Sequence, residues 1–135
     1  MADKFMRTVV IMSFFMVMAL FSGCSTNGVQ VTDADNGKQI TVKPGDVMTV
    51  TLVSNPTTGY SWQVMEIDNT ILIQVGEPEY EQSPGSEGLV GAGGTETFRF
   101  KVVGAGKTTL GLGYMRPWES LPPIETFSVT IRVEQ

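Results

Sequence analysis

Histidine is absent from the 135-residue sequence, and cysteine occurs once, as Cys24. Without histidine the chain lacks the usual general base at neutral pH and the commonest metal ligand. Ser-His-Asp triads and Cys-His pairs are therefore excluded, and a lone cysteine cannot form an internal disulfide. A glycosidase-type carboxylate pair is the remaining enzymatic option, and nothing favours it in the spacing of Glu66, Asp68, Glu119 and Glu125. We therefore expect a protein that is not an enzyme and holds neither a metal nor a cofactor.

Positive charge is also scarce, with 9 Lys and Arg residues against 14 Asp and Glu, which gives a net charge of -5. Proteins that bind nucleic acids need concentrated Lys and Arg to contact phosphates. This chain has no basic cluster, so we expect no nucleic-acid partner.

Helical periodicity is missing too, because after residue 24 no stretch of ten or more residues repeats apolar side chains at a 3.6-residue spacing.

The longest apolar run lies near the N-terminus, where residues 9–21 are apolar except for Ser13. Lys4 and Arg7 precede this run, and small residues follow it. A membrane-spanning helix needs about 20 apolar residues, so the run is too short to be one. This order of a positive, an apolar and a small-residue region is typical of a secretory signal peptide, which we assign to residues 1–23.

Cys24 directly follows this leader. The stretch from Leu20 to Cys24 resembles a prokaryotic lipobox, in which the cysteine becomes the lipidated first residue of the mature protein. Phe21 replaces the aliphatic residue usual in such boxes, so an ordinary cleavage site beside a free thiol is the alternative. Residues 24–29 suit a short tether. We expect an exported protein, anchored in a membrane through a lipid on Cys24 and facing the periplasm or cell exterior, or otherwise secreted.

The chain after the leader is short enough for a single domain, which we place at residues 30–135. From Cys24 onward there are 112 residues, with 7 basic against 13 acidic side chains and a net charge of -6. Because no disulfide is available, this domain must be held together by its hydrophobic core alone. We expect it to be a monomer.

Alternating apolar and polar residues predict short β-strands along the whole domain. Met48, Val50 and Leu52 form the apolar face of one such run, and we assign them to the core. About seven strands separated by turns favour an all-β, immunoglobulin-like β-sandwich, with a small barrel as the alternative. The expected strands are residues 38–42, 47–53, 61–65, 71–75, 96–102, 107–114 and 127–133.

Three motifs lie between these expected strands and are the candidate binding loops. We call residues 55–60 the first motif, residues 91–94 the second motif and residues 116–118 the third motif. Their residues are Asn55, Pro56, Thr57, Thr58, Gly59, Tyr60, Gly91, Ala92, Gly93, Gly94, Arg116, Pro117 and Trp118.

Each motif also has an ordinary structural interpretation. The first would be a tight turn and the second a flexible loop or β-bulge, while Trp118 would cover one end of the core. Against the turn interpretation, Thr57 and Thr58 are β-branched residues that form turns poorly and are expected to project hydroxyls and methyls from a stiff backbone. Trp and Arg are enriched at binding hot spots, so we expect Trp118 to be exposed and to face a partner. Trp62 lies within a strand, and we expect it in the core.

The three motifs, in this order, resemble the chagasin family of inhibitors of papain-like cysteine proteases. The similarity extends over about residues 30–133. It implies a sandwich with three loops gathered at one end, which occlude the active-site cleft of the protease in a tight and reversible complex. It further implies that Thr57 and Thr58 lie near the catalytic residues of the protease and that the second motif straddles one side of the cleft. Trp118 would pack on the primed-side aromatic wall, with polar contacts from Arg116.

Two other functions are also compatible with the sequence. One is a non-catalytic cell-envelope binding module of immunoglobulin-like fold, serving adhesion or stacking Trp118 and Tyr60 on sugar rings. The other is a structural envelope lipoprotein without a ligand. An inhibitor should bind papain and weaken when Trp118 is replaced, whereas a sugar-binding module should ignore papain. A structural lipoprotein should tolerate substitution in all three motifs.

Overall fold

The computed structural model describes residues 28–85 and 91–135, so the leader and Cys24 lie outside the described residues. Within them the chain forms strands and two short 3-10 helices. The strands are β1 Gly28–Thr32, β2 Gln39–Val42, β3 Val47–Ser54, β4 Ser61–Glu66, β5 Leu72–Gln74, β6 Glu79–Gln82, β7 Gly94–Val102, β8 Gly106–Met115 and β9 Glu125–Val133. The 3-10 helices are η1 Asp33–Asp35 and η2 Pro56–Thr58. In this part of the chain no helix has the length and apolar character required of a membrane span.

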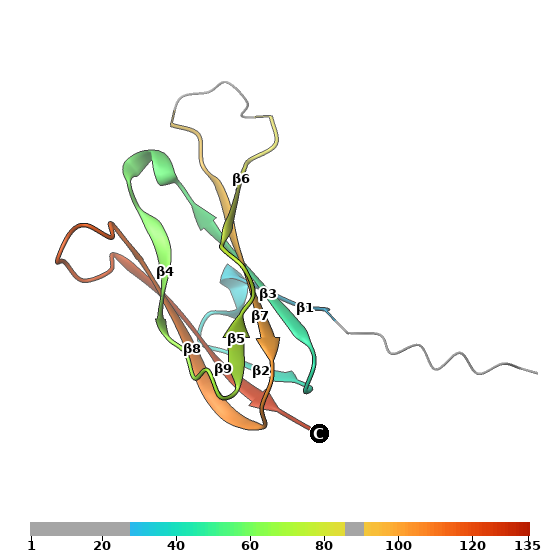
Figure 1. Ribbon diagram of the computed structural model, residues 1–135. Helices are drawn as coiled ribbons and strands as arrows, with labels where there is room; N and C mark the ends of the chain where they lie inside the picture. The colour runs from blue at the N-terminus through green and yellow to red at the C-terminus, as the bar shows by residue number, and fades with distance from the viewer. Residues whose placement is uncertain (1–27, 86–90) are drawn as a thin grey trace, which may run out of the picture.

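The strands form two sheets that pack face to face (Figure 1). One sheet has the order β1-β3-β7-β5, with β6 also paired to β7, and the other has the order β2-β9-β8-β4. The pairs β1–β3 and β2–β9 are parallel, and the other neighbours are antiparallel. The prediction of an all-β sandwich is confirmed, and the small barrel is excluded because the sheets are separate.

Alternation along the strands sets the core between the sheets, as the sequence predicts. Met48, Val50 and Leu52 of β3 are fully buried, and Met48 and Val50 lie opposite Phe100 and Phe98 of β7. Trp62 is buried, which confirms its predicted place in the core. The second sheet contributes Leu110, Leu112, Phe127, Val129 and Ile131.

The structure corrects the predicted boundaries in two places and shows nine strands in the described residues where about seven were predicted. Strand β1 begins at Gly28, within the tether predicted at residues 24–29, because it pairs in parallel with β3. Strand β6 and the first two residues of β7 lie between the strands expected at residues 71–75 and 96–102, where no strand was predicted. Both missed strands lie at sheet edges and are largely exposed, so their sequences carry little alternation.

All three motifs lie at one end of the sandwich (Figure 1). Ser54, the last residue before the first motif, pairs with Gly94 of the second, and Ser61, directly after the first motif, pairs with Met115 directly before the third. The opposite end holds the start of β1, where Gly28 pairs with Val47. The topology therefore gathers the three candidate loops, as the resemblance implies.

Candidate functional site

The first motif is a compact turn stabilised by its own hydrogen bonds. Pro56–Thr58 form η2, and Gly59 ends it in the left-handed region at φ 83°. The Thr57 hydroxyl donates to Asn55 Oδ1 at 2.5 Å, and the Thr58 hydroxyl donates to the Asn55 carbonyl at 2.7 Å. We expected these hydroxyls to project from the backbone, but both are bonded to Asn55. Both threonines are nevertheless exposed. Their hydrogen bonds make the turn rigid before any partner arrives.

The second motif contacts the first through backbone and side chain. Asn55 Nδ2 donates to the Gly91 carbonyl at 3.1 Å. A Cβ at Gly93 would lie 3.3 Å from the Ser54 carbonyl oxygen, and one at Gly94 would lie 2.0 Å from the Glu81 carbonyl oxygen. Glycine at 94 is thus required where β7 pairs closely with the end of β6, and Gly94 is buried. The exposed part of this motif is therefore confined to residues 91–93.

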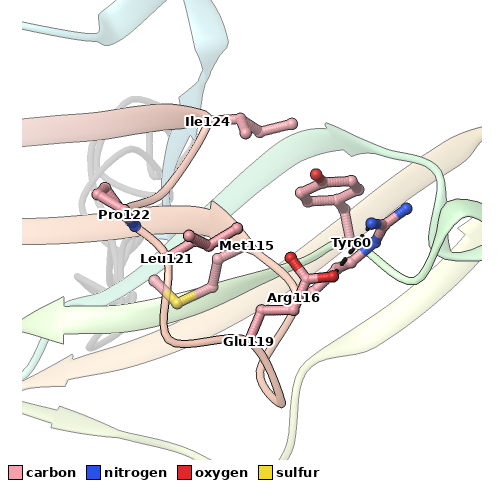
Figure 2. A pocket seen from close by; sticks show the side chains of 7 residues that line it. All are labelled: Tyr60, Met115, Arg116, Glu119, Leu121, Pro122 and Ile124. Atoms are coloured by element: carbon pink, nitrogen blue, oxygen red, sulfur yellow. Dashed lines mark hydrogen bonds and ion pairs between the residues drawn. The ribbon is translucent and has the colours of Figure 1, made fainter.

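The third motif is fastened to the first by Arg116. Its Nε donates to the Thr58 carbonyl at 3.0 Å, and its guanidinium lies 4.5 Å from the centre of the Tyr60 ring. Nη1 also pairs with Glu119 at 3.2 Å, so Arg116 bridges Tyr60 and Glu119 (Figure 2). Its Nε and Nη1 atoms are thus both engaged within the protein. Arg116 therefore fixes the two motifs relative to one another.

Trp118 is 70% exposed, which confirms the predicted exposure. One edge of its ring lies against Gly59, where an added Cβ would be 2.6 Å from Trp118 Cη2. The absence of a side chain at Gly59 therefore lets the first and third motifs meet. An indole this exposed, yet resting on a rigid turn, offers a partner a large apolar surface.

Aromatic rings support the first motif from below. The Tyr114 hydroxyl accepts a hydrogen bond from the Asn55 backbone N–H at 2.9 Å. Its ring contacts those of Tyr60 and Trp62, at centroid distances of 5.5 Å and 5.1 Å. Trp62 Nε1 donates to the Val53 carbonyl at 2.9 Å. The strands on either side of the motif are thus joined through buried and half-buried rings.

A buried carboxylate, that of Glu96, joins the two ends of the first motif. Glu96 is 7% exposed. Its Oε1 accepts a hydrogen bond from the Ser54 hydroxyl at 3.0 Å, and its Oε2 accepts one from the Trp62 backbone N–H at 2.8 Å. Ser54 directly precedes the motif, and Trp62 follows it by two residues. We call this arrangement the Glu96 clamp. The alternation of β7 contains a signal for this clamp that was not recognised, because the acidic Glu96 is in phase with the inward-facing Phe98 and Phe100.

Two of the four carboxylates considered for catalysis, Glu119 and Asp68, have structural partners. Glu119 is paired with Arg116, as described above. Asp68 accepts hydrogen bonds from the Thr70 hydroxyl and backbone N–H, which lower the pKa of Asp68. The general acid of a glycosidase needs a raised pKa, so the hydrogen bonds from Thr70 make Asp68 less suited to that role. Within the described residues no group of three or more potential ligands is placed to hold a metal ion.

Comparison with known proteins identifies the family. The family model described as "Chagasin family peptidase inhibitor I42" matches residues 41–131. The chain belongs to the chagasin family. Because members of this family are peptidase inhibitors, the protein is not an enzyme.

Individual relatives agree with this assignment. Chagasin of Trypanosoma cruzi is 41% identical over 93 residues, which cover 66% of this chain and 82% of that protein. Amoebiasin-2 of Entamoeba histolytica is 28% identical over 125 residues, covering 90% of this chain and all of the relative. Among solved structures, Leishmania mexicana ICP is 32% identical with a TM-score of 0.57, over 74% of this chain and 90% of that one. The cysteine protease inhibitor EhICP2 of Entamoeba histolytica shares the fold at a TM-score of 0.70 and 24% identity, covering 79% and 96% of the two chains.

Proposed function

We propose that this protein is a tight-binding, reversible inhibitor of papain-like cysteine proteases that occludes the active-site cleft with the three motifs. Membership of the chagasin family makes it an inhibitor of cysteine proteases. The observation that carries the finer proposal is the bonding of the motifs into one surface. Asn55 bonds to the second motif through Gly91, and Arg116 bonds the third motif to Thr58.

Preorganisation explains how such a surface could bind tightly without chemistry. Ordering flexible loops on binding costs free energy, which a loop already held in its bound shape does not lose again. The first motif carries two internal hydroxyl bonds and the clamp at its base. Because its backbone turns through η2 instead of running extended, it does not present a peptide bond as a stretched substrate does. It therefore enters the cleft as a wedge that is not cleaved.

We assign different contacts with the protease to the exposed residues of the motifs. Thr57 and Thr58 form the tip of the wedge and would lie at the centre of the cleft. Trp118 would lose its large exposed surface against the protease, and buried Trp anchors at interfaces contribute about 2 kcal/mol or more. Arg116, which already bonds to Thr58 and Glu119, holds these elements in register rather than supplying mainly direct contacts.

The sugar-binding alternative is disfavoured by the surroundings of Tyr60. A stacking platform needs an open aromatic face, and the guanidinium of Arg116 lies over the Tyr60 ring. The ring also contacts Tyr114 at a centroid distance of 5.5 Å. Trp118 alone would remain as a platform.

We also propose that the mature protein is a monomer that is exported and anchored through a lipid on Cys24. Export and anchoring are supported by the leader at residues 1–23 and by the lipobox-like sequence that ends at Cys24. Growth with a labelled fatty acid should mark the wild-type protein and leave a Cys24→Ala variant unlabelled. Labelling of neither would favour the secreted form.

Titration of papain with residues 25–135, followed by hydrolysis of a fluorogenic peptide, tests the inhibitory function. We expect stoichiometric or nanomolar inhibition, with the inhibitor recovered intact. A serine protease titrated in the same way serves as the control and should keep its activity. Absence of papain inhibition at tens of micromolar, with the domain shown to be folded, would overturn the proposal.

A further inference from the structure

An apolar segment lies directly beyond the third motif and belongs to none of the three. Leu121 is 65% exposed and Ile124 is 59% exposed, and Trp118 is only three residues before Leu121. These are three of the nine large hydrophobic side chains found exposed in the described residues. We call residues 121–124 the apolar lip. Clustered exposed apolar side chains mark an interaction surface more often than isolated ones do.

The lip encloses a small pocket together with the first motif. Leu121, Pro122 and Ile124 line it with Tyr60 and Met115 (Figure 2). The pocket has a volume of about 40 Å³. Sites for small molecules usually have volumes of about 300 Å³ or more, so this one is too small for a substrate or cofactor. It suits the end of one side chain that projects from a larger partner.

The electrostatics of the pocket favour an apolar side chain. Arg116 and Glu119 complete its lining, and their ion pair at 3.2 Å leaves no net charge there. Their side chains are only about one third exposed. A charged side chain from a partner would find no free counter-ion in this pair, whereas an aliphatic or aromatic one would contact the five other lining residues.

The lip is held in place by the sheet beneath it. The Ile124 backbone N–H donates to the Tyr114 carbonyl at 2.9 Å. Pro123 lies over Gly113, where an added Cβ would be 2.9 Å from Pro123 Cγ and 2.4 Å from Met65 Sδ. Two consecutive prolines further restrict the backbone. The pocket is therefore present before a partner binds.

We propose that the apolar lip is an additional contact surface for the target protease, and that its pocket receives an apolar side chain from the wall beside the active-site cleft. The inference rests on the proposed function. The pocket is continuous with the proposed binding surface, because it shares Tyr60 with the first motif and Arg116 with the third. A protease seated on Trp118 and the first motif lies within reach of the pocket. Because that wall lies outside the catalytic centre, the lip distinguishes one papain-like protease from another.

A double variant, Leu121→Ser with Ile124→Ser, tests this role. Both side chains are exposed, so the fold should be retained. The matched control is Ile73→Ser with Val103→Ser, which also removes two exposed aliphatic side chains, 46% and 44% exposed, away from the three motifs. Inhibition constants are measured for the mature protein against a panel of papain-like proteases. We expect the lip variant to weaken inhibition of the best-inhibited members by about tenfold or more, unequally across the panel, with the control unchanged.

A photo-crosslinking amino acid at position 121 gives a direct readout of contact. It should crosslink to a bound protease, and the same group at position 73 should not. Inhibition within twofold of wild type across the panel, together with no crosslink at 121, would overturn the lip proposal while leaving the proposed function intact. Crosslinking of 121 to a second copy of the inhibitor would also overturn it, in favour of self-association. Failure of the wild-type protein to inhibit any protease would instead defeat the proposed function.

Discussion

Replacement of Glu96 by alanine should destabilise the fold and should also weaken inhibition by the molecules that remain folded. The carboxylate accepts one hydrogen bond from Ser54 and one from the Trp62 backbone, and a hydrogen bond to a carboxylate contributes about 1.5 kcal/mol or more. Loss of both should lower the free energy of unfolding by about 3 kcal/mol. The two ends of the first motif would then move independently.

The effect on binding follows from the cost of ordering the released chain. Fixing the backbone of one residue costs about 1–2 kcal/mol. If the variant frees about two residues at the base of the first motif, binding must supply about 2 kcal/mol or more in addition. The inhibition constant of Glu96→Ala should therefore rise about thirtyfold or more. Glu96→Gln should restore most of the inhibition, because its amide can accept from Trp62 and donate to Ser54.

Asp46 provides a matched control for this prediction. It is also a buried carboxylate, 9% exposed, and its Oδ2 accepts a hydrogen bond from the Lys43 backbone N–H at 2.9 Å. Residues 43–46 form a turn that precedes β3 at the end of the sandwich opposite to the motifs. Asp46→Ala should therefore lose stability without losing inhibition. Stability is measured by urea unfolding, and inhibition constants are measured at a temperature where every variant is folded. An unchanged inhibition constant for folded Glu96→Ala would refute the reasoning and leave the clamp a purely stabilising contact.

Three further substitutions test the contacts around the first motif. Trp118→Ala should change stability by less than about 0.5 kcal/mol, because the side chain is mostly exposed, yet weaken inhibition about thirtyfold; equal inhibition by the variant would contradict the assigned contact. Gly59→Ala places a methyl group 2.6 Å from Trp118 Cη2 at a positive φ, so it should cost about 1 kcal/mol of stability in thermal unfolding and also weaken inhibition. Tyr114→Phe removes the acceptor for the Asn55 N–H, which should cost about 1 kcal/mol and speed hydrogen exchange at that amide. Unchanged exchange at Asn55 would show that this bond does not hold the loop.

The core and the position of the three motifs were predictable because they leave local patterns in the sequence. Met48, Val50 and Leu52 alternate with polar residues, and each motif interrupts such alternation with turn-forming residues. Strand β6 leaves no such pattern, since its residues are largely exposed and form a strand through pairing with β7. Edge strands of this kind depend on a partner that lies elsewhere in the sequence.

The contacts that turn three loops into one surface were also beyond local reasoning. Asn55 meets Gly91 across 36 positions, and Arg116 meets Thr58 across 58. A single sequence gives no distance between such residues. The resemblance placed the loops at one end but said nothing of Glu96, because the clamp acts beneath the motifs. The same limit applied to the threonine hydroxyls, whose acceptors on Asn55 become apparent only once η2 is formed.

The position of β1 determines where this protein can be attached to an anchor, a tag or a surface without covering the motifs. Gly28 lies beside Val47 at the start of β3, and the eight residues of β3 separate that point from Ser54 by roughly 25 Å. Val133, near the C-terminus, pairs with Gly106 at the same pole as Gly28. An anchor, an affinity tag or a biosensor surface joined before Gly28 therefore attaches at the pole away from the motifs and leaves them accessible. Two copies fused end to end through a flexible linker would likewise keep both sets of loops free, which makes the fold suitable for a bivalent inhibitor.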